Sequence, residues 1–428
     1  MPTSSQGAAS HLQGLLGSTS VKEIRSKLES RHHPLPTRIP GATIASTKAI
    51  DARWKALSHA SSSKAHLAPA PSIRSLAHYA RNIENLIGTV QVPVGVAGPL
   101  RINGTYASGD YYVPLATTEA ALVASYHRGA RLISECGGCS AVTLAEGVSR
   151  APGFIFTTLA QAGEFVAWAI GQKDAFATKA ATTTRHGKLS DMRVAIEGNH
   201  VYLIFEFLTG DAAGQNMVTI ATEAICEFIR QHSPVKVRKI FVEANLSGDK
   251  KASSQSFLSV RGKKVSAEVI IPAHLIRKRL HTDVSAISEY WAMTVLGGVQ
   301  SGTIGAQGHY ANGLAALFIA TGQDAACVSE AAVGITRFEK QEDGSLYASV
   351  TLPNLIVGTV GGGTSLPAQA ACLDILGLRG NGHAQALAEV AAALSLAGEL
   401  SIIGAVTAGH FSRAHKKLAR RKPTATID

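Results

Sequence analysis

Short apolar runs alternate with helical stretches in the middle of the chain. Four runs typical of strands are residues 154–158, 192–196, 201–207 and 237–242. Helical patterns follow from Ala160 and over residues 218–231, and the Gly198-Asn199 dipeptide between the second and third runs predicts a hairpin. The resulting order, β-α-β-β-α-β, is that of a split βαβ or ferredoxin-like arrangement rather than of a Rossmann domain. We predict that residues 151–243 form such a small domain, inserted into a larger one.

Before this insertion the pattern changes from strand to helix. The apolar run over residues 90–96 fits a short strand, and the Asn-Gly dipeptide at residues 103–104 predicts a hairpin turn. A long helix follows, with Thr117 or Thr118 as its N-cap. This interpretation places Glu119 in the first helical turn, where the helix dipole favours a carboxylate. Taken alone, Glu119 is more typical of a helix start than of a catalytic acid.

After the insertion, a strand is expected around residues 265–272 and Ala-rich helices then dominate. These helices begin near Ala286, Asn312, Pro367 and Ala384. Before residue 80, one short amphipathic helix over residues 21–30 and several prolines indicate a helical, loop-rich arm. The fold class is therefore α+β, with a large helix-rich domain, a small inserted domain and an N-terminal arm.

Composition narrows the class of protein. The chain has 428 residues, 46% hydrophobic and 17% charged, which excludes a mainly disordered chain. Lys and Arg number 41 against 30 Asp and Glu, and the net charge of +11 favours anionic partners such as phosphate-bearing cofactors or nucleic acid. A nucleic-acid-binding protein stays a remote alternative, because no zinc-finger, helix-turn-helix or stacking-aromatic motif is recognisable.

Neither a membrane span nor a metal site is expected. The most apolar stretch, residues 387–409, contains Glu389 and Glu399, which lipid tolerates poorly. The N-terminus lacks the pattern of a secretory signal, and the five cysteines fit free thiols, so we expect a cytoplasmic protein without a membrane partner. The lone CxxC at residues 136–139 has no second pair to complete a metal site.

Several loops are candidates for chemistry. Residues 210–217 open a helix with a glycine-containing loop suited to phosphate, although capping by Asp211 explains the pattern equally well. Residues 358–364 hold three consecutive glycines, more than a tight turn needs. Asp324 lies inside an apolar helical pattern, where a carboxylate is costly unless it is paired or used. The adjacent lysines at residues 250–251 are, on spacing alone, more typical of solvated surface.

These segments, in their order along the chain, resemble the catalytic portion of the 3-hydroxy-3-methylglutaryl-coenzyme A reductase family, from about Asn82 to Leu418. The matching stretches are residues 84–88 (ENLIG), 93–99 (PVGVAGP), 116–119 (ATTE), 249–251 (DKK), 322–326 (GQDAA) and 358–364 (GTVGGGT). Several such matches in the family's order are far more specific than any one of them. The Thr-Thr-Glu and Asp-Lys-Lys sequences are similar to those of the eukaryote/archaeal-type class.

The architecture that the resemblance implies agrees with the pattern and adds a long central helix and a loop that carries the catalytic lysine. The implied organisation is an N-terminal arm at residues 1–83, the first part of the substrate and CoA domain at 84–150, a nicotinamide-cofactor domain at 151–243, the lysine loop at 244–253 and the rest of the large domain at 254–428. A homodimer or higher homo-oligomer, with the active site between subunits, is implied as well.

The implied reaction is the four-electron reduction of a thioester to an alcohol with two NADPH, which gives mevalonate and coenzyme A. Lys250 would stabilise the negative oxygen that forms when hydride reaches the carbonyl carbon, and Glu119 would supply a proton. Asp324 would hold both, and His415 would protonate the leaving coenzyme A thiolate. No metal takes part.

The resemblance also implies binding residues. Those for the cofactor are Arg185, which would grip the 2′-phosphate of NADPH, and Asp211, Asn216, Gly361, Gly362 and Gly363. Those for the substrate are Arg150 and Lys251 at the acyl carboxylate, and Glu84, Asn85, Ser125, Arg128, His309 and Asn312 elsewhere on the acyl-CoA.

Some positions depart from the family's pattern. Glu243 replaces the serine of a Ser-Gly-Asn sequence, and Met293 replaces a lysine that contacts the acyl carboxylate. Ala213 and Gln215 stand where methionines are usual, and Arg421 stands where animal enzymes carry a regulatory serine. Glu243 adds negative charge near an anionic substrate. A related acyl-CoA reductase, or a degradative NAD-dependent enzyme with another acyl specificity, therefore stays the alternative.

Overall fold

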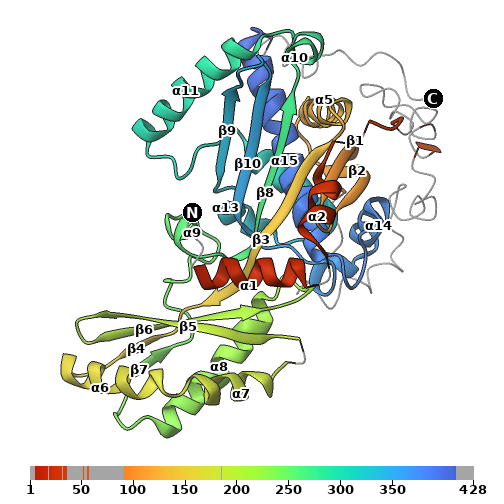
Figure 1. Cartoon of the computed structure of the whole chain (residues 1–428). Coiled ribbons are helices and arrows are strands. Elements are labelled where there is room, and N and C mark those ends of the chain that lie inside the picture. The colour runs from red at the N-terminus through yellow and green to blue at the C-terminus, as the bar shows by residue number, and fades with distance from the viewer. Residues whose placement is uncertain are drawn as a thin grey trace.

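The computed structural model describes residues 5–17, 19–30, 32–35, 52, 55–56, 91–184 and 186–410 (Figure 1). Its strands are β1 (Val94–Gly104), β2 (Ser108–Ala116), β3 (Cys139–Arg150), β4 (Gly153–Ile155), β5 (Lys188–Glu197), β6 (His200–Leu208), β7 (Lys239–Phe241), β8 (Gly262–Ile271), β9 (Ile335–Lys340) and β10 (Leu346–Leu355). Its helices are α1 (Ser5–Leu16), α2 (Val21–Leu28), α5 (Leu122–Glu135), α6 (Leu159–Ile170), α7 (Lys173–Ala181), α8 (Gln215–His232), α9 (Gln255–Leu258), α10 (Ala273–Leu280), α11 (Val284–Ser301), α12 (Tyr310–Thr321), η3 (Ala325–Cys327), α13 (Val328–Ala331), η4 (Gly362–Ser365), α14 (Pro367–Leu376) and α15 (Ala384–Thr407). The fold mixes helices with a largely antiparallel sheet, as the α+β expectation requires.

The long strand β3 connects the two halves of the sheet. Its first part, through Gly147, pairs with β8, and its last residues, Val148–Arg150, pair with β6 (Figure 1). On one side the strand order continues β8-β10-β9, and on the other it is β7-β4-β6-β5 with every neighbouring pair antiparallel. The pairing of β1 with β3 is parallel, whereas the other strand pairs are antiparallel.

Two separate clusters of buried apolar side chains lie on either side of this connection. The smaller cluster gathers the aromatic residues of the half that contains β4 to β7, among them Phe154, Phe165, Phe176 and Phe205. The larger cluster surrounds α15, which lies across the sheet formed by β8, β10 and β3. Hydrophobic burial therefore stabilises each half largely through its own core.

Helix α15 is the central helix of the larger half. It is long and apolar enough to cross a membrane by length and composition, and 83% of its most apolar window is buried inside the protein. Glu389 and Glu399 on this helix are both fully buried and accept hydrogen bonds. A buried carboxylate needs such donors, because burial without them costs several kcal/mol.

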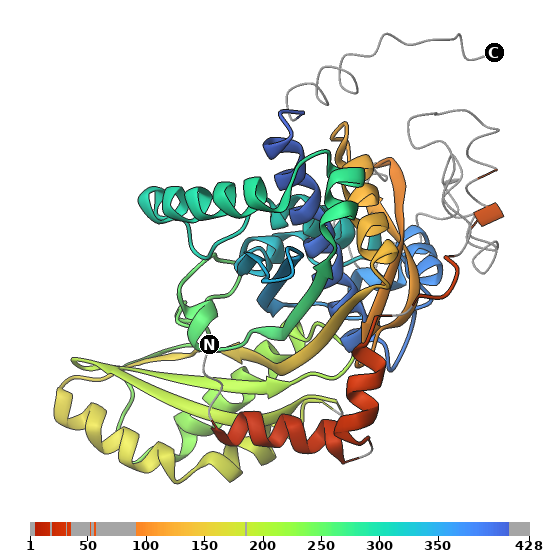
Figure 2. The same cartoon turned by 45° about the horizontal axis from the view of Figure 1, so that its top comes forward.

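The N-terminal helices α1 and α2 lie beside β3 and β1, near the junction of the two halves (Figure 2). The buried Arg101 of β1 fixes the segment after α2, since its Nη1 donates to the backbone oxygen of His33 at 2.8 Å. Arg101 also forms an ion pair with Asp110 of β2 at 2.7 Å. Helix α2 confirms the amphipathic helix expected from residue 21.

The structure contradicts the expected start of the helix after β2. The helix α5 begins at Leu122, and its N-cap Ala121 has a left-handed φ of 73° and no side-chain cap. The backbone of Thr117 still follows the strand, because its N–H donates to the oxygen of Pro93. Glu119 therefore lies in the connection before the helix, not in its first turn, so its carboxylate is not in the position that the helix dipole favours.

The hairpin turn expected at residues 103–104 is displaced. Strand β1 extends to Gly104, and the turn is made by residues 105–107, with the N–H groups of Tyr106 and Ala107 donating to the carboxylate of Glu389. A Cβ at Gly104 would collide with that carboxylate. A buried charge on a distant helix thus determines the position of this turn.

Candidate active site

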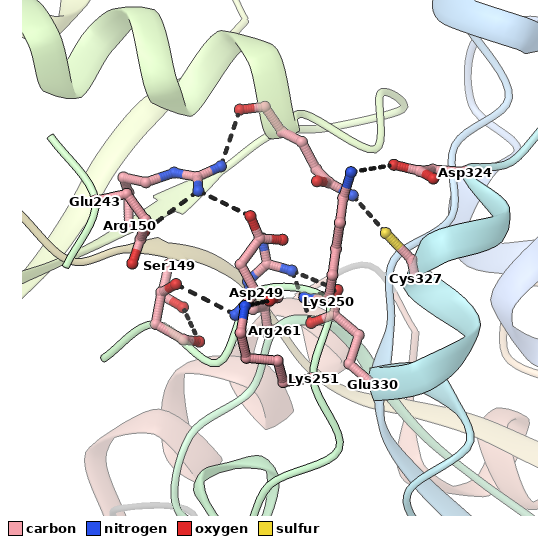
Figure 3. Close-up of polar contacts among 12 residues, drawn as sticks. Ser149, Arg150, Glu243, Asp249, Lys250, Lys251, Arg261, Asp324, Cys327 and Glu330 are labelled. Carbon is pink, nitrogen blue, oxygen red and sulfur yellow. Dashed lines mark hydrogen bonds and ion pairs between the residues drawn. The ribbon is translucent and has the colours of Figure 1, made fainter. Parts of the chain in front are cut away.

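Lys250 and Asp324 meet although 74 residues separate them in the sequence. The Nζ atom of Lys250 lies 2.9 Å from Oδ2 of Asp324 (Figure 3). Lys250 stands on the loop after β7 and has a left-handed φ of 56°, which is uncommon for a lysine and indicates a backbone held by its surroundings. Its N–H donates to Oε1 of Glu330 at 3.2 Å.

The apolar sequence context predicts Asp324 inside a helix. In the structure Asp324 instead follows the end of α12. Helix α12 ends at Gly322, whose φ is 73°, and Asp324 then caps the short helix η3 by accepting the N–H of Ala326 at 3.0 Å. Because one carboxylate oxygen is fixed by the backbone, the other is directed toward Lys250.

The pair stabilises its own charges. The hydrogen bond that Lys250 donates to Asp324 raises the pKa of Lys250 above its ordinary value, against the opposing effect of desolvation. Burial alone would raise the pKa of Asp324, but the hydrogen bonds from Lys250 and from the Ala326 N–H outweigh it and lower that pKa. An ammonium ion next to a carboxylate is the arrangement needed to stabilise a developing oxyanion.

A second layer of buried charges supports this pair. Arg261, 2% exposed, has its Nη1 at 2.7 Å from both carboxylate oxygens of the fully buried Glu330, and its Nη2 lies 2.7 Å from Asp249 (Figure 3). Burial raises the pKa of Glu330, and Arg261 opposes that rise. No motif in the sequence singles out either residue. A glutamate among the apolar residues 328–333 was the available signal, because such a position requires a buried partner.

Arg150 lies at the end of β3, where the chain passes from one half to the other. Its Nη1 lies 2.9 Å from Asp249 and 3.2 Å from Glu243 (Figure 3). Lys251, the other residue expected at the acyl carboxylate, has an exposed side chain that donates to the backbone oxygen of Asp249. The structure thus brings these two residues together around Asp249.

Three glycine-bearing loops converge on this site. The side-chain amide of Gln323 donates to the oxygen of Gly358 at 3.0 Å and accepts its N–H at 2.8 Å. Gly322 and Gly363 touch through their backbones, so that a Cβ on either would collide with the other. Ala212 pairs with Val360, which places the loop before α8 beside the second glycine loop.

The candidate cofactor residues differ in their surroundings. Gly361 and Gly362 have φ values of 75° and 51°, and a Cβ at either would meet no heavy atom within 4 Å. Asn216 is exposed in the first turn of α8. The carboxylate of Asp211, by contrast, accepts the N–H groups of Gly382 at 2.8 Å and Ala384 at 3.2 Å, so it caps the start of α15 rather than its own helix.

The residues expected to face coenzyme A lie around α15. Ser125 contacts Ser401 at 2.9 Å, and Arg128 donates to the oxygen of Ser401 at 2.7 Å. His309 stacks on Tyr126 with ring centroids 5.5 Å apart, and its oxygen accepts the N–H of Asn312. The structure therefore brings Ser125 and Arg128 of α5 close to the start of α12.

Two residues stand apart from the Lys250–Asp324 pair. The Glu119 side chain is exposed, and the Glu119 backbone N–H donates to Oγ1 of Thr117. Within residues 91–184 and 186–410, Glu119 makes no hydrogen bond or ion pair with Lys250 or Asp324. Met293 is 75% exposed on α11. Four expected site residues lie outside the described residues, namely Glu84, Asn85, Arg185 and His415, and so does Arg421.

Comparison with known proteins identifies the family. The family model for hydroxymethylglutaryl-coenzyme A reductase matches residues 49–420. The 3-hydroxy-3-methylglutaryl-coenzyme A reductase of Pyrococcus horikoshii is 46% identical over 347 residues, covering 79% of this chain and 84% of that protein. The enzyme of the same name from Methanothermobacter thermautotrophicus is 43% identical over 342 residues, covering 79% and 85%.

A solved structure agrees with the fold. The class II 3-hydroxy-3-methylglutaryl-CoA reductase from Streptococcus pneumoniae, bound to NADPH in open conformations, matches with a TM-score of 0.66 and 20% identity over 86% of this chain and 100% of that chain. The matched sequence covers both halves and includes Lys250 and Asp324. The chain therefore belongs to the hydroxymethylglutaryl-coenzyme A reductase family.

Proposed function

We propose that this protein reduces 3-hydroxy-3-methylglutaryl-CoA to mevalonate and coenzyme A with two molecules of NADPH, a step of isoprenoid biosynthesis. The observation that carries the proposal is the ion pair between Lys250 and Asp324 beside two glycine loops, in a chain of this family. A thioester carbonyl that accepts hydride needs a fixed positive charge at its oxygen, and Lys250 provides one.

The protein's own residues handle charge and protons in each reduction. NADPH, when bound, supplies the hydride that adds to the carbonyl carbon. Lys250 donates a hydrogen bond to the carbonyl oxygen as it becomes negative, and Asp324 keeps that ammonium charged. Glu119 supplies the proton that turns the oxyanion into a hydroxyl, and His415 protonates the coenzyme A thiolate that leaves after the first reduction.

The glycine loops fit a dinucleotide phosphate group. At Gly361 and Gly362 a Cβ would meet no protein atom, so the backbone is open to a ligand. The N-terminus of α8, with Asn216 exposed beside it, offers N–H groups of the kind that bind phosphate. We assign Arg185 to the 2′-phosphate of NADPH. Asp211 holds the loops together through the start of α15, and Gly363 allows their close packing on Gly322.

The substrate is assigned to the surroundings of Lys250 and α15. Arg150 and Lys251 face the acyl carboxylate in this proposal, supported by their shared contact with Asp249. The remaining acyl-CoA contacts are Glu84, Asn85, Ser125, Arg128, His309 and Asn312.

The finer architecture is part of the same proposal. The antiparallel order β7-β4-β6-β5 with its own core supports a ferredoxin-like cofactor domain at residues 151–243, inserted into the substrate domain and followed by the lysine loop at residues 244–253. A homodimer, with Glu119 of one subunit reaching Lys250 of the other, is supported by the lack of a Glu119–Lys250 contact within the described part of one chain.

The test is the stoichiometry of the reaction. Purified protein is mixed with the hydroxymethylglutaryl thioester and NADPH or NADH, and cofactor oxidation, thiol release and mevalonate are measured. We expect two NADPH oxidised for each thiol released, and slower reaction with NADH. Absence of cofactor oxidation with this thioester at any pH would overturn the proposal.

A further inference from the structure

Glu243 lies against the arginine that the proposed function assigns to the acyl carboxylate. The Nη1 atom of Arg150 contacts Glu243 at 3.2 Å and Asp249 at 2.9 Å (Figure 3). Its Nη2 donates to the backbone oxygen of Gln215 at 3.4 Å. The Arg150 side chain is only 6% exposed. Its Nε is buried and makes no hydrogen bond within the part of the chain that the structure describes. Arg150 therefore contacts two carboxylates, and only a small part of its side chain is left exposed to a ligand.

Backbone donors fix the carboxylate of Glu243 in this position. The N–H of Ala151 donates to its Oε2 at 3.3 Å, and the N–H of Asn245 donates to its Oε1 at 2.6 Å. With Arg150 as a third donor, the carboxylate is held at both oxygens rather than free to rotate into solvent. An acyl carboxylate that approaches Arg150 thus meets a fixed negative charge.

Arg150 and Arg261 share a group of carboxylates. Asp249 is shared by Arg150 and Arg261, and Arg261 also pairs with Glu330. Two guanidinium groups therefore face three carboxylates once Glu243 is included. A neutral residue in place of Glu243 would remove one of these three negative charges, and this would favour an incoming anion.

We propose that Glu243 is a specificity-determining residue, which competes with the acyl carboxylate for Arg150. It lowers the affinity of the site for the hydroxymethylglutaryl group relative to acyl groups whose far end carries no charge. This inference rests on the proposed function and adds the residue that sets acyl preference. Because Glu243 lies at Arg150 and makes no contact with Lys250 within the described residues, it acts on KM rather than on kcat.

The test compares two thioesters. KM and kcat are measured for the wild type, Glu243→Gln and Glu243→Ser with hydroxymethylglutaryl-CoA and with its carboxamide analogue, in which the carboxylate is a neutral amide. We expect KM for the natural thioester to fall about tenfold in both variants, kcat to stay within about twofold, and KM for the carboxamide to stay constant. Glu135→Gln, which removes a carboxylate placed between Arg131 and Arg279 at the far end of α5, serves as the control and leaves both constants unchanged.

Two further measurements make the outcome decisive. Thermal melting shows that the variants are folded, and calorimetric titration with free 3-hydroxy-3-methylglutarate measures acyl binding without turnover. An unchanged or higher KM and unchanged or weaker binding in folded variants overturn the inference, because Glu243 then only holds Arg150 in place. A parallel fall in KM for the carboxamide overturns it too. A wild type that binds the acyl group without oxidising NADPH counts against the proposed function instead.

Discussion

The charge state of Lys250 depends on the carboxylate beside it. Asp324 raises the pKa of Lys250, while Lys250 and the Ala326 N–H lower the pKa of Asp324 in spite of its partial desolvation. The pair is therefore charged from above the lowered pKa of Asp324 to below the raised pKa of Lys250. The attraction is lost as pH falls through the first value, and again as pH rises through the second.

Removal of the ammonium group should stop hydride transfer without preventing binding. For Lys250→Ala we expect kcat to fall by about 10²–10³-fold or more, because the developing oxyanion loses its stabilising charge. Single-turnover oxidation of NADPH measures this step, and calorimetry should give a dissociation constant for coenzyme A within about twofold of wild type. Lys173→Ala, which removes an exposed lysine paired with Asp191, is the control. Loss of coenzyme A affinity in Lys250→Ala would contradict the assigned role.

The Asp324 carboxylate should set the alkaline limit of activity. In Asp324→Asn the amide no longer raises the pKa of Lys250, so the alkaline limb of the kcat profile for the second reduction, in which His415 protonates no thiolate, should move to lower pH, and kcat at its maximum should fall at least about tenfold. Profiles of kcat against pH from 5 to 11 measure both effects. An alkaline limb at the wild-type position would mean that a group other than Lys250 controls it.

At the level of secondary-structure elements, helix ends and glycine turns place the loops of the site next to one another. Helix α12 ends at Gly322 in a left-handed conformation, which allows the backbone of Gly363 to pack directly on it and leaves Asp324 two residues further on. Helix α14 ends at Gly377 with almost the same φ, 71° against 73°, but there a Cβ would meet open space. The two glycines thus share a backbone requirement and differ only in the neighbouring loop.

This difference gives a matched pair of variants. Gly377→Ala should lower the free energy of unfolding by about 1 kcal/mol, the cost of a left-handed residue with a side chain. Gly322→Ala should cost about 1–3 kcal/mol more, because its methyl group also displaces the Gly363 loop, and it should lower kcat as well. Urea titration and steady-state rates measure the two effects. Equal destabilisation by both substitutions would show that the loop contact is unimportant.

For the whole molecule, β3 and α15 decide how the halves and their loops are placed. Strand β3 belongs to both parts of the sheet, and Arg150 lies at its end, next to the lysine loop. On the opposite flank, α11 exposes Met293, Leu296 and Val299, which are three residues apart and 64–75% exposed. Such a stripe of apolar side chains is typical of a surface that another chain covers.

A charge on this stripe should weaken the proposed homodimer. For Leu296→Glu we expect a dimer or larger assembly to shift toward monomer in light scattering, because a buried unpaired charge at an interface is costly. Activity should fall with it, since Glu119 would then have no partner subunit to reach. Ile196→Glu, at an exposed apolar position at the end of β5, should change neither quantity. A wild type that is monomeric and fully active would exclude the shared site.

Local sequence signals were enough for much of the molecule. The Gly198-Asn199 hairpin between β5 and β6 and the helix α8 follow from local patterns of apolar and turn residues, and the structure confirms these elements. Resemblance of short stretches to a known family singled out Lys250 and Asp324 before any geometry was available. Both kinds of signal depend on neighbours in the chain.

Contacts between distant segments decided the rest. The carboxylate of Glu389 on α15 determines the turn after Gly104. The hydrogen bond from the Thr117 N–H to the Pro93 oxygen keeps Thr117 in the strand arrangement, so that α5 begins later than expected. Asp211 caps α15, which begins 173 residues further along the chain. The sequence by itself determined the family and the kinds of elements, because both are encoded in consecutive residues. Only the tertiary structure decided which buried charges compensate one another, such as Arg261 with Glu330 and Arg150 with Glu243, because the cost of burying a charge depends on the partner that folding brings to it.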